Sequence, residues 1–183
     1  MEIKGEYQIA SSRESVWAAL NDPEVLKRCI PGCESLEKTS DTEFSGSVTA
    51  AIGTVKARFK TKLSLEDLNP PESYTLAGDS KAGVAGFGRG SAKVKLVEQA
   101  GGTLLSYEAE FKVGGKLAQV GSRLVLGVTR KIADQFFGAF SKELDPAAER
   151  IDVPVKGGRP SMATWLVVGG VLLLLLAAWF LVR

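Results

Sequence analysis

The sequence ends in an apolar run from Met162 to Val182 that contains no charged side chain. At about 1.5 Å of rise per residue, a helix of this length measures about 31 Å, which matches the hydrocarbon thickness of a bilayer. Trp165 and Trp179 lie near its two ends, where indole rings anchor a helix at the membrane–water interface. A buried core helix is the alternative, but no globular segment follows to bury it. The pattern therefore predicts a transmembrane tail anchor over residues 162–183.

The charges that flank this run predict its orientation. Arg150, Lys156 and Arg159 lie shortly before it, whereas only Arg183 follows it. Because basic residues concentrate on the cytoplasmic side of membrane helices, we expect the N-terminal side in the cytoplasm. The first residues show no basic stretch followed by an apolar one, so no signal peptide is predicted. The expected location is the cytoplasmic membrane, with a soluble domain facing the cytoplasm.

Composition narrows the chemistry of that domain. Residues 1–144 hold 19 basic and 18 acidic residues, and a domain so close to neutral is a poor nucleic-acid binder. The chain has no histidine, which excludes Ser-His-Asp and Cys-His catalysis and the usual zinc sites. We expect no metal site and no covalently bound cofactor. Cys29 and Cys33 are most simply reduced thiols, and a redox or metal role for them stays open.

Two short helices are predicted after a first strand that carries Ile3 and Ile9. Ser11 with Glu14 forms a capping box for the first helix. The tripeptide at 21–23, Asn-Asp-Pro, caps the second helix and places its proline at the first helical position, where the missing N–H costs nothing. Further strands are predicted where apolar and polar residues alternate, over the ranges 44–50, 55–65, 74–78, 92–96 and 105–113.

The periodicity changes near the end of the domain. From Lys116 to Leu144 the apolar residues are spaced by three and four, which indicates one long amphipathic helix. Residues 145–161 contain three prolines and a Gly-Gly pair. They are predicted to form a flexible linker that reaches about 50 Å when stretched.

Two short helices, a six-stranded antiparallel sheet that includes the first strand, and a long helix bury their apolar faces together when the sheet curls around the long helix. We therefore predict an α+β fold of the helix-grip type over residues 1–144. Four segments then carry a family resemblance: IPGCESLE at 30–37, GTVKARFK at 53–60, PPESY at 70–74 and GGKLAQVGSRL at 114–124. The domain closely resembles the G subunit of carbon monoxide dehydrogenase, a family in the START-like group that includes polyketide cyclases and ubiquinone-binding proteins.

The resemblance implies a hydrophobic cavity between the sheet and the long helix. It also implies a role at the membrane beside a cytoplasmic molybdenum-containing CO dehydrogenase. The residues support a cavity independently, because small side chains such as Gly46 and Ala109 lie among large ones on the inward faces. The alternative is that Phe44, Phe59 and Phe111 close this space as ordinary core.

A ligand of such a cavity should be apolar and largely uncharged. Tyr74 and Tyr107 would add two hydroxyls, and a quinone carbonyl would serve as the partner that a buried phenol needs. Alternatively, these hydroxyls lie at the rim and bond to backbone or water. The predicted ligand-binding residues are Trp17, Ile30, Phe44, Phe59, Tyr74, Tyr107, Phe111, Val120, Leu124 and Val128.

The glycine-rich stretch 81–90 lacks the dinucleotide-binding spacing, and no helix is predicted after it to hold a phosphate. We predict a hairpin loop that is either a plain connector or a contact for lipid or a partner protein. The candidate contact residues are Gly86, Phe87, Gly88, Arg89 and Gly90. The basic row Lys56, Arg58, Lys60 and Lys62 is most simply a solvated face, with an acidic partner or anionic lipid as the alternative.

Three function classes remain. The first is a non-catalytic, membrane-tethered carrier that presents a lipophilic molecule, most simply a respiratory quinone, to a soluble dehydrogenase. The second is a pure adaptor that recruits the enzyme to the membrane. The third is a cyclase or hydrolase of the same fold, which is disfavoured because no carboxylate pair falls on an inward strand face.

Overall fold

The structure is a computed structural model that describes residues 1–145. Seven strands form one antiparallel sheet in the order β1-β7-β6-β5-β4-β3-β2. The strands are β1 (Glu2–Ile9), β2 (Cys33–Lys38), β3 (Glu43–Ile52), β4 (Val55–Asn69), β5 (Ser73–Lys81), β6 (Phe87–Gln99) and β7 (Gly102–Gly114). The helices are α1 (Arg13–Leu20), α2 (Pro23–Cys29), the 3-10 helix η1 (Gly83–Ala85), α3 (Lys116–Gln119) and α4 (Ser122–Glu143).

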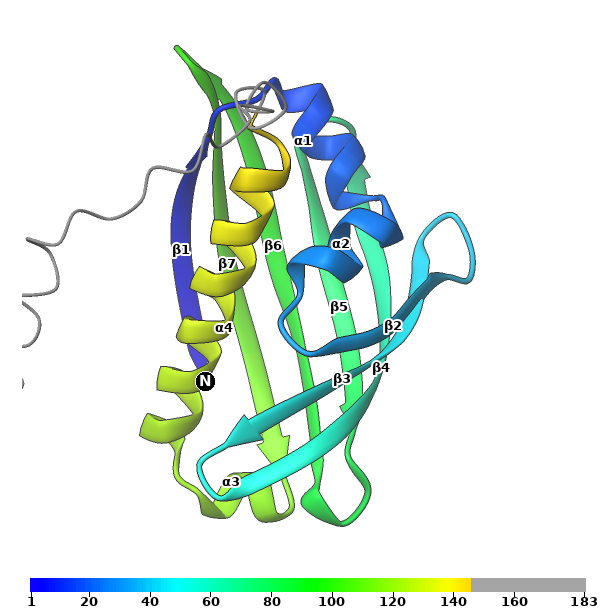
Figure 1. The fold of residues 1–183 in the computed structure, drawn as a ribbon, viewed down its shortest axis with the longest axis vertical. Coiled ribbons are helices and arrows are strands. Elements are labelled where there is room, and N and C mark those ends of the chain that lie inside the picture. The colour runs from blue at the N-terminus through cyan, green and yellow to red at the C-terminus, as the bar shows by residue number, and fades with distance from the viewer. Residues whose placement is uncertain (146–183) are drawn as a thin grey trace, which may run out of the picture. The chain divides into compact units, whose positions relative to one another are not determined.

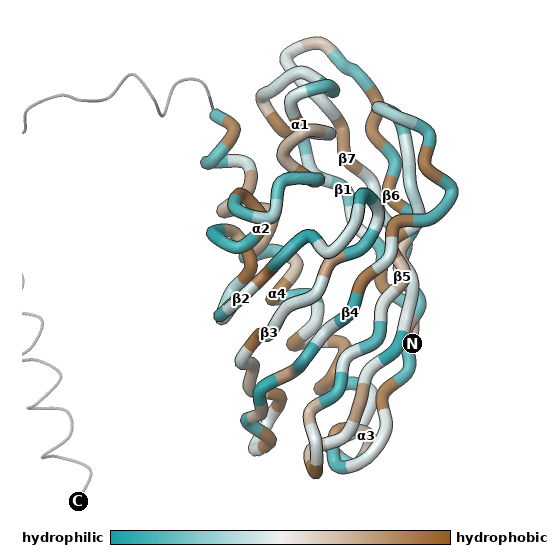
Figure 2. The backbone as a smooth tube through the Cα atoms, turned by 90° about the vertical axis from the view of Figure 1, so that its right-hand side faces the viewer, coloured by the Kyte–Doolittle hydropathy of each residue, from teal (hydrophilic) through white to brown (hydrophobic). Residues whose placement is uncertain are grey.

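The sheet curls around α4, and α1 and α2 lie on the same side of the sheet (Figure 1). Figure 2, turned by 90°, shows the three helices together on that side. The core lies between them, and its fully buried side chains include Ile9, Leu96, Leu105 and Phe140. This arrangement is the predicted helix-grip fold of an α+β domain.

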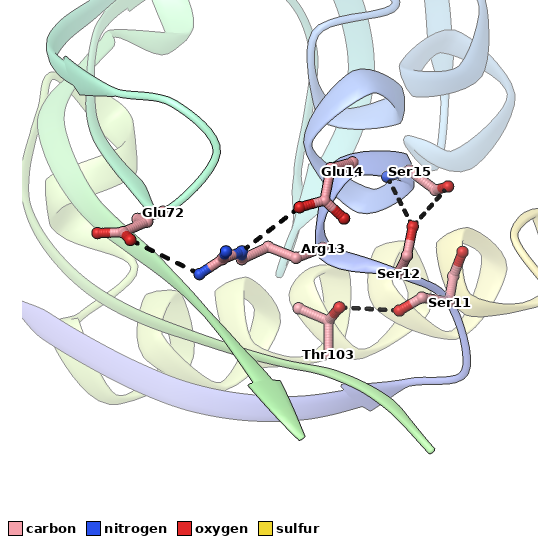
Figure 3. Close-up of polar contacts among 7 residues, drawn as sticks. All are labelled: Ser11, Ser12, Arg13, Glu14, Ser15, Glu72 and Thr103. Carbon is pink, nitrogen blue, oxygen red and sulfur yellow. Dashed lines mark hydrogen bonds and ion pairs between the residues drawn. The ribbon is translucent and has the colours of Figure 1, made fainter. Parts of the chain in front are cut away.

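The start of α1 is tied to the sheet from two directions (Figure 3). Ser12 is the N-cap, and its hydroxyl accepts from the Ser15 amide at 3.3 Å. The prediction that Ser11 caps this helix is therefore wrong by one residue. Ser11 instead offers its carbonyl oxygen to the hydroxyl of Thr103, at 2.8 Å. Arg13 adds an ion pair with Glu72 of the β4–β5 turn, at 3.7 Å.

The start of α2 follows the sequence pattern. The Asp22 carboxylate accepts from the amides of Glu24, at 2.8 Å, and Val25, at 3.4 Å. A proline occupies the first turn, as predicted. At the other end of α2, Arg28 forms an ion pair with Glu143, the last residue of α4. This contact links α2 to α4.

Three predicted elements need correction. The helix expected over 116–144 is interrupted at Gly121, whose φ of 89° favours glycine, so α3 and α4 are separate helices. The loop expected over 81–90 is confined to 82–86, because β5 continues to Lys81 and β6 begins at Phe87. Strand β2 lies in a segment to which the alternation assigns no strand.

Within residues 1–145, no helix is long and apolar enough to cross a membrane. The predicted anchor at 162–183, with Trp165 and Trp179, lies outside the described residues. The same holds for the predicted linker beyond residue 145.

Candidate ligand-binding site

An apolar pocket of about 340 Å³ lies between the inner face of the sheet and the helices. Its wall contains no charged side chain, and only two tyrosines and one threonine contribute hydroxyls. The wall consists of Leu20, Leu26, Ile30, Pro31, Leu36, Phe44, Leu63, Leu65, Tyr74, Leu76, Ala92, Val94, Leu105, Tyr107, Ala109, Thr129, Ile132, Ala133, Phe136 and Phe137.

Two rows of paired residues on β5, β6 and β7 make the strand side of the pocket. Val94 pairs with both Tyr74 and Tyr107, so the two phenols lie on either side of one valine. In the next row, Ala92 pairs with Leu76 and Ala109. Because antiparallel neighbours present paired residues to the same face, both rows face the groove. The two alanines leave the space that larger side chains would fill.

Helix α4 closes the other side of the pocket with one face. The Thr129 hydroxyl donates a hydrogen bond to the carbonyl oxygen of Val125, at 2.9 Å, so its proton already has an acceptor within the helix. Phe136 and Phe137 bring two aromatic rings, whose centroids are 4.9 Å apart. Ala133 lies one helical turn before these two rings, and its small side chain leaves room in the pocket.

Tyr107 belongs to a stack of aromatic rings at the β1 edge. Its ring lies 5.6 Å from that of Phe137 and 6.3 Å from that of Tyr7, centroid to centroid. Gly5 pairs with Tyr107, and a Cβ at Gly5 would lie only 2.8 Å from a Tyr107 ring carbon. The ring therefore needs a glycine beneath it. Burial raises the pKa of Tyr107, and a hydrogen bond with Tyr7 partly offsets this effect.

Tyr7 connects this stack to solvent. Its hydroxyl donates to the Asp134 carboxylate of α4 at 2.6 Å. Burial, followed by this hydrogen bond, raises the pKa of Tyr7 above its ordinary value. The aromatic stack is thus fixed to α4 by a polar contact outside the pocket.

Tyr74 differs from the other two tyrosines because, among residues 1–145, no group hydrogen-bonds its hydroxyl. Its side chain is 7% exposed and lines the pocket. The indole of Trp17 packs edge-on against its ring, with centroids 5.5 Å apart. Burial raises the pKa of Tyr74, so the phenol is a protonated donor at neutral pH. The pocket leaves this hydroxyl accessible, since its oxygen is not among the fully buried unpaired polar atoms of residues 1–145, and a ligand acceptor in the pocket would accept its hydrogen bond.

The structure brings four of the ten predicted ligand-binding residues into the pocket wall, namely Ile30, Phe44, Tyr74 and Tyr107. Trp17 and Phe111 pack against the core beside it. Phe59, Val120, Leu124 and Val128 are not part of the wall. The role of all ten in ligand binding stays a prediction.

The expected inward orientation of Leu124 is wrong, since this side chain is 44% exposed and Val125 is buried instead. The break at Gly121 restarts the helix, so its first buried residue is Val125 and not Leu124, whereas farther along the inward face includes the predicted Ile132, Phe136 and Phe140 together with their neighbours. The spacing pattern therefore missed Thr129, Ala133 and Phe137, although it contained Ile132 and Phe136. The glycine at 121 was the signal in the sequence for this break.

The candidate contact loop is partly strand. Phe87 is the first residue of β6 and is 50% exposed. Arg89 pairs across the strands with Asp79, Nε to Oδ1, at 2.5 Å. Arg89 is exposed on the sheet. The same is true of the basic row, which consists of Lys56, Arg58, Lys60 and Lys62. A contact role for Gly86–Gly90 stays a prediction.

No group of three or more His, Cys, Asp or Glu side chains that could hold a metal ion occurs within residues 1–145. Cys29 and Cys33 are free, and burial raises the pKa of both thiols. Raised pKa values lower the thiolate fraction, which makes both cysteines poor nucleophiles.

A curved sheet that wraps a long helix and encloses an apolar pocket defines the class of helix-grip, START-like proteins. Solved structures share this fold. A conserved protein from Geobacillus kaustophilus is 30% identical, with a TM-score of 0.74, over 79% of this chain and 95% of that chain. A protein from Thermus thermophilus is 18% identical, with a TM-score of 0.62, over 81% of this chain and 99% of that chain. The Zhui aromatase/cyclase from Streptomyces sp. R1128 is 13% identical, with a TM-score of 0.59, over 86% of this chain and 99% of that chain, and shows the fold alone.

Within this class the sequence identifies one family. The family profile of the carbon monoxide dehydrogenase G subunit, CoxG, matches residues 5–145. The chain belongs to this CoxG family. A search of curated protein sequences gave no match.

Proposed function

We propose that this protein is a non-catalytic carrier, tethered to the cytoplasmic membrane, that binds a lipophilic molecule in the pocket between the sheet and α4. The ligand in this proposal is a respiratory quinone, and the partner is a molybdenum-containing CO dehydrogenase in the cytoplasm. The family name supports the choice of partner. The predicted anchor at 162–183 supports the tether, because a quinone is dissolved in the bilayer.

The observation that carries the proposal is a single unpartnered donor in an otherwise apolar pocket. The wall offers no charge to balance a charged ligand. It does offer the Tyr74 hydroxyl, which has no hydrogen-bond partner in the described part of the chain. A flat, apolar ring with a carbonyl oxygen satisfies both features. A plain hydrocarbon would leave the phenol unpaired, and an acid would bring an uncompensated charge.

Two alternatives lead to different expectations. A pure adaptor needs only the membrane tether and a surface for the dehydrogenase, so the pocket would be irrelevant to it. A cyclase or hydrolase needs acid and base groups at the ligand. The pocket wall presents no carboxylate, amine, imidazole or thiol. Its phenols have raised pKa values, so they are weaker acids than free tyrosine and almost no phenolate is present at neutral pH to act as a base. This chemistry favours a carrier over an enzyme.

The test uses the full chain and a pocket-filling substitution. Ala133→Trp places an indole in the pocket, and we expect a cost of only about 1 to 3 kcal/mol because the space is open. Leu124→Trp is the matched control on the same helix, at a position that is 44% exposed. Lipids extracted from each protein, purified from native membranes, are identified by mass spectrometry. We expect quinone with the wild type and Leu124→Trp, and none with Ala133→Trp.

Electron transfer separates the carrier from the adaptor. CO-dependent quinone reduction is measured in washed membranes that contain equal amounts of each variant and of the dehydrogenase. A carrier predicts that Ala133→Trp still recruits the dehydrogenase but fails to support quinone reduction. Normal rates with a pocket shown to be empty would reject the carrier and leave the adaptor.

A further inference from the structure

The charges of the domain are strongly segregated along the chain. Three segments, 44–65, 80–97 and 111–133, contain no aspartate or glutamate. They hold four, four and five basic residues, respectively. Every carboxylate side chain of residues 1–145 therefore lies elsewhere, although the domain as a whole is nearly neutral.

The fold brings the middle parts of these three segments to one end of the sheet. The β3–β4 turn, the β5–β6 connector with η1, and α3 with the start of α4 lie together there (Figure 1). The backbones of the second and third segments are in close contact, because a Cβ on Gly115 would lie only 2.7 Å from the Cα of Gly86. The side chain of Leu124 lies against Gly53, because a Cβ placed on that glycine would be only 2.8 Å from a Leu124 methyl carbon. We call residues 52–56, 81–89 and 112–124 the basic end.

The basic end also carries exposed apolar side chains. Val84 is 88% exposed, Phe87 50% and Leu124 44%. Five exposed cations surround them and form no ion pair within residues 1–145, namely Lys56, Lys81, Lys112, Lys116 and Arg123. Hydrophobic tips among unpaired cations are the surface composition of peripheral membrane proteins.

We propose that the basic end docks directly on an anionic lipid surface. Val84 and Phe87 enter the boundary between headgroups and acyl chains, and the surrounding lysines and arginine lie among the phosphates. A hollow beside Phe87 is lined by Lys81 and Lys112, and also by Arg89 with its ion-pair partner Asp79, so the two lysines are the side chains that offer it free positive charge for phosphate groups.

A lipid surface fits this end better than a protein partner. The apolar side chains protrude from η1 (Val84), the first residue of β6 (Phe87) and the first turn of α4 (Leu124), and not from one flat element. Gly83 and Gly121, which flank them, have open space where a Cβ would be. A fluid headgroup layer adapts to separate protrusions, whereas a protein partner must match their shape. The absence of acidic residues from all three segments suits a surface of uniform negative charge.

This contact is a property of the domain itself and does not depend on what the pocket binds. Helix α4 runs from the basic end toward the opposite end of the sheet (Figure 1). Its 22 residues measure about 33 Å, and the predicted linker that follows is long enough to exceed this distance. The tether thus permits the basic end to face the same membrane in which the tail is predicted to be anchored.

The first experiment measures vesicle binding by the domain alone. Residues 1–145 contain the whole described core, and the Geobacillus relative is a chain of which 95% aligns with this fold, so the domain is a self-contained unit. We expect it to sediment with vesicles of phosphatidylglycerol and phosphatidylcholine, but not with pure phosphatidylcholine. Binding should weaken as salt is raised, because exposed charges are screened.

Two double variants test the two components of the surface. Val84→Asp with Phe87→Ser should weaken binding by about tenfold or more, because the apolar insertion is lost. Lys81→Glu with Lys112→Glu should weaken it by at least about 25-fold, because each basic side chain near an anionic surface is worth about fivefold in affinity and the two new carboxylates are repelled as well. A thermal melt of each variant verifies that the fold is retained.

Matched controls change the same residue types elsewhere. Leu68→Asp with Val97→Ser alters two side chains that are 40% and 39% exposed, outside the basic end. Lys4→Glu with Lys142→Glu makes the same change in net charge. Both controls should bind vesicles within about twofold of the wild type, apart from the long-range charge effect that salt removes.

Several results would overturn the proposal. These are no sedimentation of the domain with anionic vesicles, equal binding to neutral vesicles, or equal losses in the controls and in the variants of the basic end. A loss of dehydrogenase recruitment by the Val84→Asp, Phe87→Ser variant with unchanged vesicle binding would instead assign this end to a protein partner. None of these results would affect quinone retention in the pocket, so the two proposals fail separately.

Discussion

The pocket and the basic end use the same strands for opposite purposes. On β4, Leu63 and Leu65 line the pocket, whereas Lys56, near the start of the same strand, is exposed and belongs to the basic end. The contrast is as sharp between two phenylalanines, since Phe140 is 0% exposed and Phe87 is 50% exposed. Interior apolar residues here stabilise the fold, whereas the exposed ones are available for another surface. Substitutions of one residue type at both places can measure this difference.

The largest expected effect is on stability. Phe140→Ala removes a fully buried ring that stacks on Phe136, 5.6 Å away, and should lower the free energy of unfolding by about 3 to 5 kcal/mol. Phe87→Ala should change it by no more than about 0.5 kcal/mol, because half of the side chain is already in water. Urea denaturation of both variants measures the difference. Similar losses would show that Phe87 is part of the core.

Glycines give the next contrast. Gly86 has a φ of 122°, and a Cβ there would collide with the Gly114 carbonyl oxygen, so Gly86→Ala should cost about 1 to 3 kcal/mol. Gly127, in the second turn of α4, has open space where a Cβ would be. Gly127→Ala should therefore stabilise the protein by about 0.5 to 1 kcal/mol. Thermal melts of both variants should shift in opposite directions, and shifts of the same sign would contradict the structure.

The strand side of the pocket could be predicted from the sequence, because alternation fixes which face a residue occupies. Phe44, Tyr74 and Tyr107 were found in this way, and all three line the pocket. Phe59 and Phe111 occupy the same face, yet they lie farther along their strands than the pocket extends. Alternation gives the face of a residue but not its position along a curved groove.

The helix side could not be predicted equally well. The apolar spacing is continuous across Gly121, so it suggested one helix with Val120, Leu124 and Val128 facing inward. The positive φ of Gly121 breaks that continuity and makes Val125 the first buried residue of α4. Parts of the basic end were noted in the sequence as separate candidates, namely the loop at 81–90 and the basic row that begins at Lys56. That they form one surface with 112–124 could not be predicted, because the three segments are far apart in the chain and meet only in the fold.

Alkaline pH should distinguish the tyrosines of the groove from an exposed one. The pKa values of Tyr7, Tyr74 and Tyr107 are raised, whereas unfolded tyrosines ionise near pH 10. Above about pH 10 the native protein therefore binds more protons than the unfolded chain. The stability that is fully present below this pH is then lost as the pH rises toward the native pKa values. The loss is at most about 1.4 kcal/mol per pH unit for each retained proton.

Two variants test this origin of the alkaline loss. Tyr74→Phe should make the decline less steep, because one buried phenol no longer has a proton to retain. Phe87→Tyr adds a phenol at the half-exposed site of the basic end and should leave the decline unchanged. Urea denaturation between pH 9 and pH 11 measures both slopes. An unchanged slope in Tyr74→Phe would show that its hydroxyl titrates in the native protein as it does in water.

The smallest expected effect is the most specific for the ligand. Tyr74→Phe removes the only pocket hydroxyl that no group in residues 1–145 hydrogen-bonds, so stability at neutral pH should be unchanged or slightly higher. The affinity for a tail-less naphthoquinone should fall by about fivefold, which corresponds to one hydrogen bond of about 1 kcal/mol. Methylnaphthalene has the same ring system without carbonyl oxygens, and its affinity should be unaffected. Titration calorimetry with both probes gives the four values needed. If both probes lose affinity equally, the substitution has altered the shape of the pocket, and the assigned hydrogen bond from Tyr74 to the quinone is wrong.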